Sequence, residues 1–282
     1  MASLSSPVPT PSPFRYPGGK SWFIPYVRQW VASLPAPVHF AEPFAGGANV
    51  GLALALEDLV EHVTLVELDK NVASVWEAIL NGQSKALGER VTKFRMSKTA
   101  VMRLLRSSPR TPLTRAFVTI VKNRVRRAGI LSSTASLLKL GENGNGVHSR
   151  WYPQTLKDRI DAIAAKSSKI TFLCDDGLTF VKEHAPCKNF AFFIDPPYTV
   201  AGERLYAHSE IDHEELFKAA ASIAGNVIMT YDNSREARSF ARQWGFQTRR
   251  IRMRTSHHSE KMELLIARDF RWLNRRAVSG RK

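Results

Sequence analysis

The chain of 282 residues has few of the features that mark secreted, metal-binding or membrane proteins. Its two cysteines, Cys174 and Cys187, are too few for a disulfide framework, and they lack the spacing of metal ligands. No apolar run is long enough to span a membrane, and no apolar leader segment opens the sequence. These absences predict a cytoplasmic protein in a reducing compartment, with no metal and no membrane partner.

Acidic residues are missing from one long stretch. The chain has 41 Lys and Arg against 25 Asp and Glu, and none of these acids lies between Arg90 and Gly141. An excess of positive charge favours a polyanionic partner, because contacts with phosphates release condensed counterions. No amphipathic stretch with a Trp, Phe or Leu face accompanies the charges, so nucleic acid is favoured over a membrane surface.

The phosphate-binding loop of ATPases is also absent, although residues 13–21, PFRYPGGKS, resemble its end. The pattern G-x-x-x-x-G-K-[ST] requires a glycine where this sequence has Phe14. The preceding residues, rich in serine and proline, do not form the buried strand that this loop follows. Lys20 therefore has another role.

Short apolar runs that read as buried strands recur along the chain, with helix-like segments between most of them. One such helix covers residues 212–225, where Asp212 and Glu215 have the spacing of a capping box. Strands alternating with helices predict an α/β fold with a largely parallel sheet, and the last two runs predict a closing antiparallel pair. The predicted strands are 38–44, 62–68, 169–175, 190–196, 226–232, 247–255 and 261–267.

The alternation is interrupted once, by a segment without strand signals that contains the acid-free stretch. We interpret this segment as an inserted subdomain that is mostly helical at first and then rich in loops. A core with a basic insert suggests a catalytic unit joined to a device that holds nucleic acid. The predicted organisation is a disordered tail at 1–13, a core at 14–75 and 166–272, an insert at 76–165 and a basic tail at 273–282.

Three strand ends carry residues suited to ligand binding. The first strand runs into Gly46-Gly47, where glycines allow a ligand to approach the backbone closely. The second ends in Glu67 and Asp69, of which Glu67, at the strand end itself, is the better candidate for holding ribose hydroxyls. The third ends near Asp176, which suits an adenine amino group, although a plain helix N-cap is the alternative.

The fourth strand carries the most specific motif, FAFFIDPPYTV. Two consecutive prolines remove two N–H donors and fix a rigid turn, at the edge of the sheet where α/β proteins bind ligands. A planar amino group could donate one hydrogen to Asp195 and another to the carbonyl of Pro196. Tyr198, after Pro197, could stack on the same ring.

Taken in order, RYPGGK, AEPFAGGANV, VELD, the basic insert and DPPY resemble the Dam-like DNA adenine-N6 methyltransferases, over residues 14–270. The resemblance implies a Rossmann-like class I methyltransferase sheet and S-adenosylmethionine (AdoMet) as cofactor. It implies that Tyr16 and Lys20 border the pocket, that Glu67 binds ribose and that Asp176 binds adenine. The implied cofactor loop consists of Phe44, Ala45, Gly46 and Gly47.

The implied catalytic set is Asp195, Pro196, Pro197 and Tyr198, which would act by direct methyl transfer to an adenine flipped out of duplex DNA. The insert would recognise the target. Members specific for GATC carry a motif close to N-R-Y-G-Y-N-G, whereas residues 123–129 read NRVRRAG, so the target sequence stays open. The predicted DNA contacts are Arg124, Arg126, Arg127 and Asn145.

Two other interpretations share these motifs. An RNA adenine methyltransferase would keep the cofactor and catalytic residues and differ in the insert. A DNA-binding protein on an inactive methyltransferase core is the second alternative, and the intact DPPY argues against it. The sequence does not fix the oligomeric state, and a monomer is compatible with it.

Overall fold

A seven-stranded sheet forms the centre of the computed structural model, with the strand order β3-β2-β1-β4-β5-β7-β6. The strands are β1 (His39–Glu42), β2 (His62–Val66), β3 (Ile170–Leu173), β4 (Phe190–Ile194), β5 (Asn226–Asp232), β6 (Gln247–Arg254) and β7 (Glu260–Ala267). The structure describes residues 10–15, 19–36, 38–129, 131, 137–138, 144–197, 211–254 and 260–273.

The directions of the strands confirm the predicted fold class. Strands β1 to β5 run parallel to one another, and β7 pairs antiparallel with both β5 and β6. This is the Rossmann-like sheet of class I methyltransferases, closed by an antiparallel pair. Two predicted strands end two residues early, at Glu42 and Ile194, because a proline that cannot donate to the ladder follows closely.

Helices cover both faces of the sheet, because neighbouring residues of each strand point to opposite sides. Phe193 and Leu265 face α1 (Ile24–Ala32), α2 (Asn49–Leu56) and α3 (Lys70–Ala78). Phe192 and Leu264 face the second layer, which consists of α8 (Gly177–His184), α10 (His213–Ser222) and α11 (Arg235–Gln243). Strands β1, β2, β4 and β5 are therefore buried on both sides, as their near-continuous apolar residues predict, whereas the edge strands β3 and β6 are partly exposed.

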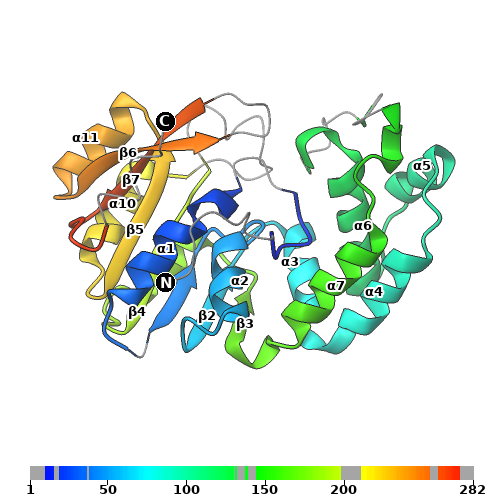
Figure 1. The fold of residues 1–282 in the computed structure, drawn as a ribbon, viewed down its shortest axis with the longest axis horizontal. Helices are drawn as coiled ribbons and strands as arrows, with labels where there is room; N and C mark the ends of the chain where they lie inside the picture. The colour runs from blue at the N-terminus through cyan, green and yellow to red at the C-terminus, as the bar shows by residue number, and fades with distance from the viewer. Residues whose placement is uncertain are drawn as a thin grey trace.

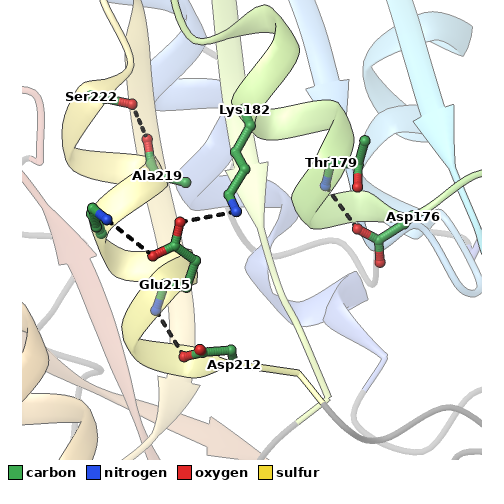
Figure 2. Close-up of polar contacts among 8 residues, drawn as sticks. Asp176, Thr179, Lys182, Asp212, Glu215, Ala219 and Ser222 are labelled. Carbon is green, nitrogen blue, oxygen red and sulfur yellow. Dashed lines mark hydrogen bonds and ion pairs between the residues drawn. The ribbon is translucent and has the colours of Figure 1, made fainter.

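The predicted capping box of α10 forms one of its two hydrogen bonds. The side chain of Asp212 accepts a hydrogen bond from the Glu215 N–H at 2.9 Å, as Figure 2 shows. The carboxylate of Glu215 does not return to Asp212 but forms ion pairs with Lys182 at 2.9 Å and Lys218 at 3.3 Å. Glu215 thus links α10 to α8 across the outer face of the sheet.

The segment predicted as an insert is helical and lies beside the sheet (Figure 1). The predicted boundary at 75/76 falls inside α3, and the apolar residues of the insert are continuous with the core under the sheet. The insert contains α4 (Ser84–Lys93), α5 (Lys98–Arg106), α6 (Pro112–Val125) and α7 (Pro153–Ala164). Short helical turns are η1 (Lys20–Phe23), η2 (Ile79–Gln83), η3 (Arg127–Gly129), η5 (Gly146–His148) and η6 (Ser167–Lys169).

The strand order reverses between β1 and β4. From β1 the chain proceeds outward through β2 and β3, and from β4 it proceeds the other way. Ligands of open α/β sheets bind at the carboxyl ends of the strands beside such a switch point. Among the described residues, no helix has the length and apolar character needed to cross a membrane.

Candidate active site

Lys20 lies at the centre of a buried ionic cluster at this switch point. Its side chain is 5% exposed, and its Nζ lies 2.9 Å from Oδ1 of Asp195 and 3.6 Å from Oε2 of Glu263. The Thr230 hydroxyl donates to the same Asp195 oxygen at 2.6 Å. The lysine of PFRYPGGKS therefore pairs with the aspartate of DPPY, although the two motifs are far apart in the sequence.

The cluster gathers residues from three neighbouring strands. Asp195 follows β4, Thr230 belongs to β5 and Glu263 to β7, while Lys20 begins η1. Asp195 is half-buried, and the following Pro196 is buried. The turn after β4 thus holds a carboxylate whose position is fixed by an ammonium group and a hydroxyl.

Glu42, at the end of β1, is a buried carboxyl group that sequence reasoning missed. It is 4% exposed, and its Oε2 accepts a hydrogen bond from the Gly51 N–H at 2.8 Å. Burial raises the pKa of Glu42 to about 8, the charge of Asp195 adds to the rise, and the Gly51 N–H and Lys20 oppose it. The group is therefore mostly protonated at neutral pH.

The raised pKa of Glu42 predicts a loss of stability as the pH rises. Its folded pKa of about 8 exceeds the ordinary 4.5, so the unfolded chain releases this proton first as the pH rises through that window. Glu42→Gln removes this effect, and the variant should gain stability relative to the parent between pH 5 and pH 8. Urea unfolding across the window measures the difference.

A matched control for this prediction is Glu89→Gln. Glu89 forms an exposed ion pair with Lys93, and the hydrogen bond from Lys93 lowers the pKa of Glu89. Replacing Glu89 should give no gain in stability at high pH, because the folded protein stabilises the ionised form of Glu89. A Glu42→Gln protein that keeps the pH slope of the parent would contradict the raised pKa.

The glycine turn after β1 is fixed from two sides. Glu67 accepts hydrogen bonds from the Gly46 N–H at 2.9 Å and the Asp69 N–H at 2.8 Å, and Trp76 donates its indole N–H to the Gly46 carbonyl at 3.1 Å. Gly46 has a φ of 46°, in the left-handed region that favours glycine. Burial raises the pKa of Glu67 to about 7, although hydrogen bonds from the backbone N–H groups of Asp69, Gly46 and Leu68 act in the opposite direction.

A polar atom without a hydrogen-bond partner lies next to this turn. Asn49, the first residue of α2, is 7% exposed, and its Oδ1 is buried with no donor among the described residues. A buried acceptor left unsatisfied is costly, on the order of 1–3 kcal/mol. Sequence reasoning passed over Asn49, because an asparagine next to a glycine turn reads as a turn residue.

Asp176 acts as the N-cap of α8, the alternative that the sequence left open. Its side chain accepts a hydrogen bond from the Thr179 N–H at 2.7 Å (Figure 2). A β-carbon on the next residue, Gly177, would lie 2.2 Å from the Pro43 carbonyl oxygen and 2.8 Å from the ring of Phe44. The turns after β3 and β1 are thus in direct contact, and Gly177 permits it.

The structure describes most of the other residues predicted for the cofactor and target site. Ala45, Gly46 and Gly47 are buried in the turn between β1 and α2, and Phe44 is half-buried. Tyr16 and Tyr198 lie outside the described residues, so their predicted roles stay predictions. Among the residues that the structure does describe, no group of His, Cys, Asp or Glu side chains is arranged to hold a metal ion.

Arg124, one of the predicted DNA contacts, is buried in the structure. It is 4% exposed and donates a hydrogen bond to the Pro13 carbonyl, so it is not on the surface where DNA would lie. Arg126 is half-buried and donates to the Leu131 carbonyl at 3.1 Å, whereas Arg127 and Asn145 are exposed. The sequence motif shows which residues are basic but not which of them face solvent.

Residues 10–15, which we name the strap, lie against the insert. The composition of 1–13 predicts a disordered tail, yet Ser12 is fully buried and its carbonyl accepts from Arg159 at 3.0 Å. Arg159 also donates to the Thr10 hydroxyl at 3.1 Å, and Phe14 is buried edge-on against Trp76, with ring centroids 5.4 Å apart. Side chains of α3, α6 and α7 therefore hold the strap.

Asn123 is the centre of this attachment. It is fully buried, accepts the Arg15 N–H at 2.8 Å and donates to the carbonyls of Arg15 at 2.9 Å and Gly129 at 2.8 Å. Gly129 has a φ of 77°, and a β-carbon there would lie 2.0 Å from the Arg15 carbonyl oxygen. The Asn-Arg pair that resembles a recognition motif instead fixes the segment that leads to Lys20.

The sequence matches no protein-family model and no curated protein. Among solved structures, it is similar to a SAM-dependent methyltransferase from Agrobacterium tumefaciens, with 11% identity, a TM-score of 0.42 and 89% of this chain covered. This chain spans 62% of that protein. It is also similar to a putative RNA methyltransferase from Pyrococcus horikoshii, with 12% identity, a TM-score of 0.40, and 94% of this chain and 90% of that chain covered. The fold assignment rests on the strand order and directions of the sheet itself.

Proposed function

We propose that this protein transfers a methyl group from AdoMet to the N6 amino group of an adenine in duplex DNA. The observation that carries the proposal is the turn Asp195-Pro196-Pro197 at the switch point, with its carboxylate held by Lys20 and Thr230. A carboxylate next to a carbonyl on a rigid turn matches the two N–H donors of a planar amino group. The fold supports the proposal, and so does the excess of basic residues in the insert.

The residues around the glycine turn fit AdoMet. The unsatisfied Oδ1 of Asn49 suits an ammonium donor such as that of the methionine part of AdoMet. Glu67 already accepts hydrogen bonds from backbone N–H groups, but a carboxylate offers about four lone-pair sites, which leaves an acceptor for a ribose hydroxyl. Asp176 uses one oxygen as a helix cap, and we assign its other oxygen to the adenine amino group.

The chain's own residues provide orientation and electrostatic stabilisation. Bound AdoMet would supply the methyl group: its bond to sulfur would break as the bond to N6 forms, S-adenosylhomocysteine would leave, and the proton lost from N6 would pass along its hydrogen bond to Asp195 and on to solvent. Asp195 and the Pro196 carbonyl accept the two N–H groups of adenine, which localises the nitrogen lone pair that is otherwise delocalised into the ring. As positive charge develops on N6, the fixed carboxylate of Asp195 stabilises it.

Access to N6 requires the adenine to leave the duplex. We assign Tyr198, which lies outside the described residues, to stacking on the flipped base. Arg127 begins η3, just after α6, and Asn145 precedes η5. Both side chains are exposed, so we assign them to DNA contacts. Arg126 contributes to a lesser extent, because it is half-buried.

The proposal is tested by incubating the purified protein with labelled AdoMet and unmethylated genomic duplex DNA, beside a structured RNA. We expect label in the DNA, on adenine N6, in one short sequence context read by sequencing. If label enters only the RNA, the substrate is RNA rather than DNA, and the proposed methyl transfer still holds. If no methyl group is transferred and calorimetry detects no AdoMet binding, the protein is a DNA-binding protein with an inactive methyltransferase core.

A further inference from the structure

Helix α5 has a basic face formed by three exposed cations. Lys98, Arg103 and Arg106 are exposed, and within the described part of the chain none of the three forms an ion pair. Ser97 caps the helix by accepting the Ala100 N–H at 3.1 Å, and Val101 is buried toward α6. The cations therefore project from a helix that is anchored on its opposite side.

A shallow surface depression, largely open to solvent, lies along this basic face. It is lined by Lys98, Thr99, Met102, Arg103, Arg106 and Ser107. The lining combines three cations with two hydroxyl side chains, groups that bind phosphate oxygens. It contains no carboxylate, in keeping with the absence of acidic residues from Arg90 to Gly141.

We propose that this face of α5 binds the phosphate backbone of duplex DNA that flanks the target adenine, an inference that rests on the proposed function. From Lys98 to Arg106 the face spans about 12 Å along the helix axis, the rise of three to four nucleotides in one strand. Figure 1 shows α5 at the outer side of the insert, away from the sheet. The contacts therefore fall on flanking duplex and lengthen the footprint beyond the flipped base.

The test measures equilibrium binding of fluorescent duplexes by anisotropy over a range of salt concentrations, without methyl transfer. The variant Arg103→Gln/Arg106→Gln removes two cations and retains good helix formers. On a duplex of ~40 base pairs we expect weaker binding and a salt slope reduced by about 2, one per lost phosphate contact. On shorter duplexes, which leave out flanking base pairs, the difference between the variant and the parent should shrink.

The matched control is Arg235→Gln/Arg242→Gln on α11, which removes the same charge from exposed positions at the other end of the molecule. The control should keep the slope of the parent, and thermal melting verifies that all proteins fold. Equal slopes for the α5 and α11 variants would overturn the inference while leaving the proposed function intact. A loss seen on RNA alone would overturn the assignment to DNA, and a parent protein that binds no duplex would overturn both proposals.

Discussion

Replacing Asp195 by alanine is expected to lower the rate of methyl transfer on the order of 100-fold or more. The carboxylate is fixed before the reaction, so its interaction with the charge that develops on N6 costs no reorganisation. Single-turnover transfer from saturating AdoMet to unmethylated duplex DNA measures the loss. Binding of AdoMet should change little, because the residues assigned to AdoMet follow β1, β2 and β3.

The fold should tolerate this substitution. Removing one partner of a buried ion pair usually costs 3–5 kcal/mol, because the other charge stays uncompensated. Here Lys20 retains Glu263 at 3.6 Å, so its ammonium group is not left alone. We therefore expect Asp195→Ala to lose stability by less than about 3 kcal/mol and to remain folded at assay temperature.

Two control variants separate the charge of Asp195 from its position. Asp195→Asn keeps the volume and one acceptor oxygen but removes the negative charge, so it should lose most of the rate. Thr230→Val removes the hydroxyl that donates to Asp195 and keeps the β-branched shape, so it should lose less. An Asp195→Ala protein that keeps a rate within about tenfold of the parent would contradict the assigned role.

The sheet could be predicted because its strands are determined by local pattern. Most of the apolar runs end at a proline, a glycine or an acid, and the central strands are buried on both faces, so almost every residue there carries the same signal. The turns at Gly46-Gly47 and Asp195-Pro196 could be predicted for the same reason, since glycine and proline mark the end of a strand. Their closeness follows from the pairing of β1 with β4, which the alternation of strands and helices does not specify.

The ionic cluster and the strap could not be predicted in this way. Glu42 and Glu263 look like ordinary strand residues, and their burial depends on the elements packed over them. Asn123 contacts a residue 108 positions earlier, a distance at which sequence pattern carries no information. The letters around Asn123 favoured DNA recognition, whereas its three hydrogen bonds depend on tertiary packing.

Replacing Asn123 by alanine is the second change with a large expected effect. The substitution leaves the Arg15 N–H and the carbonyls of Arg15 and Gly129 without their partner, at 1–3 kcal/mol for each group that stays buried. We expect a loss of about 3 kcal/mol in the free energy of unfolding, measured in urea. Arg124→Met should cost less, because burial lowers the pKa of Arg124 to about 9 and its charge is itself expensive to bury.

The strap should also affect catalysis, because it leads directly to the segment that carries Lys20. At a temperature where Asn123→Ala remains folded, kcat should fall while the Kd for AdoMet stays unchanged. The reason is that the segment before Lys20 is no longer fixed, so the position of Lys20 next to Asp195 is less well defined. Gly129→Ala should give the same result by a different route, because its β-carbon would collide with the Arg15 carbonyl. If both variants lost stability and kept kcat, the strap would support the insert alone. If both lost kcat, the residues that resemble a recognition motif would be positioning residues for the active-site lysine.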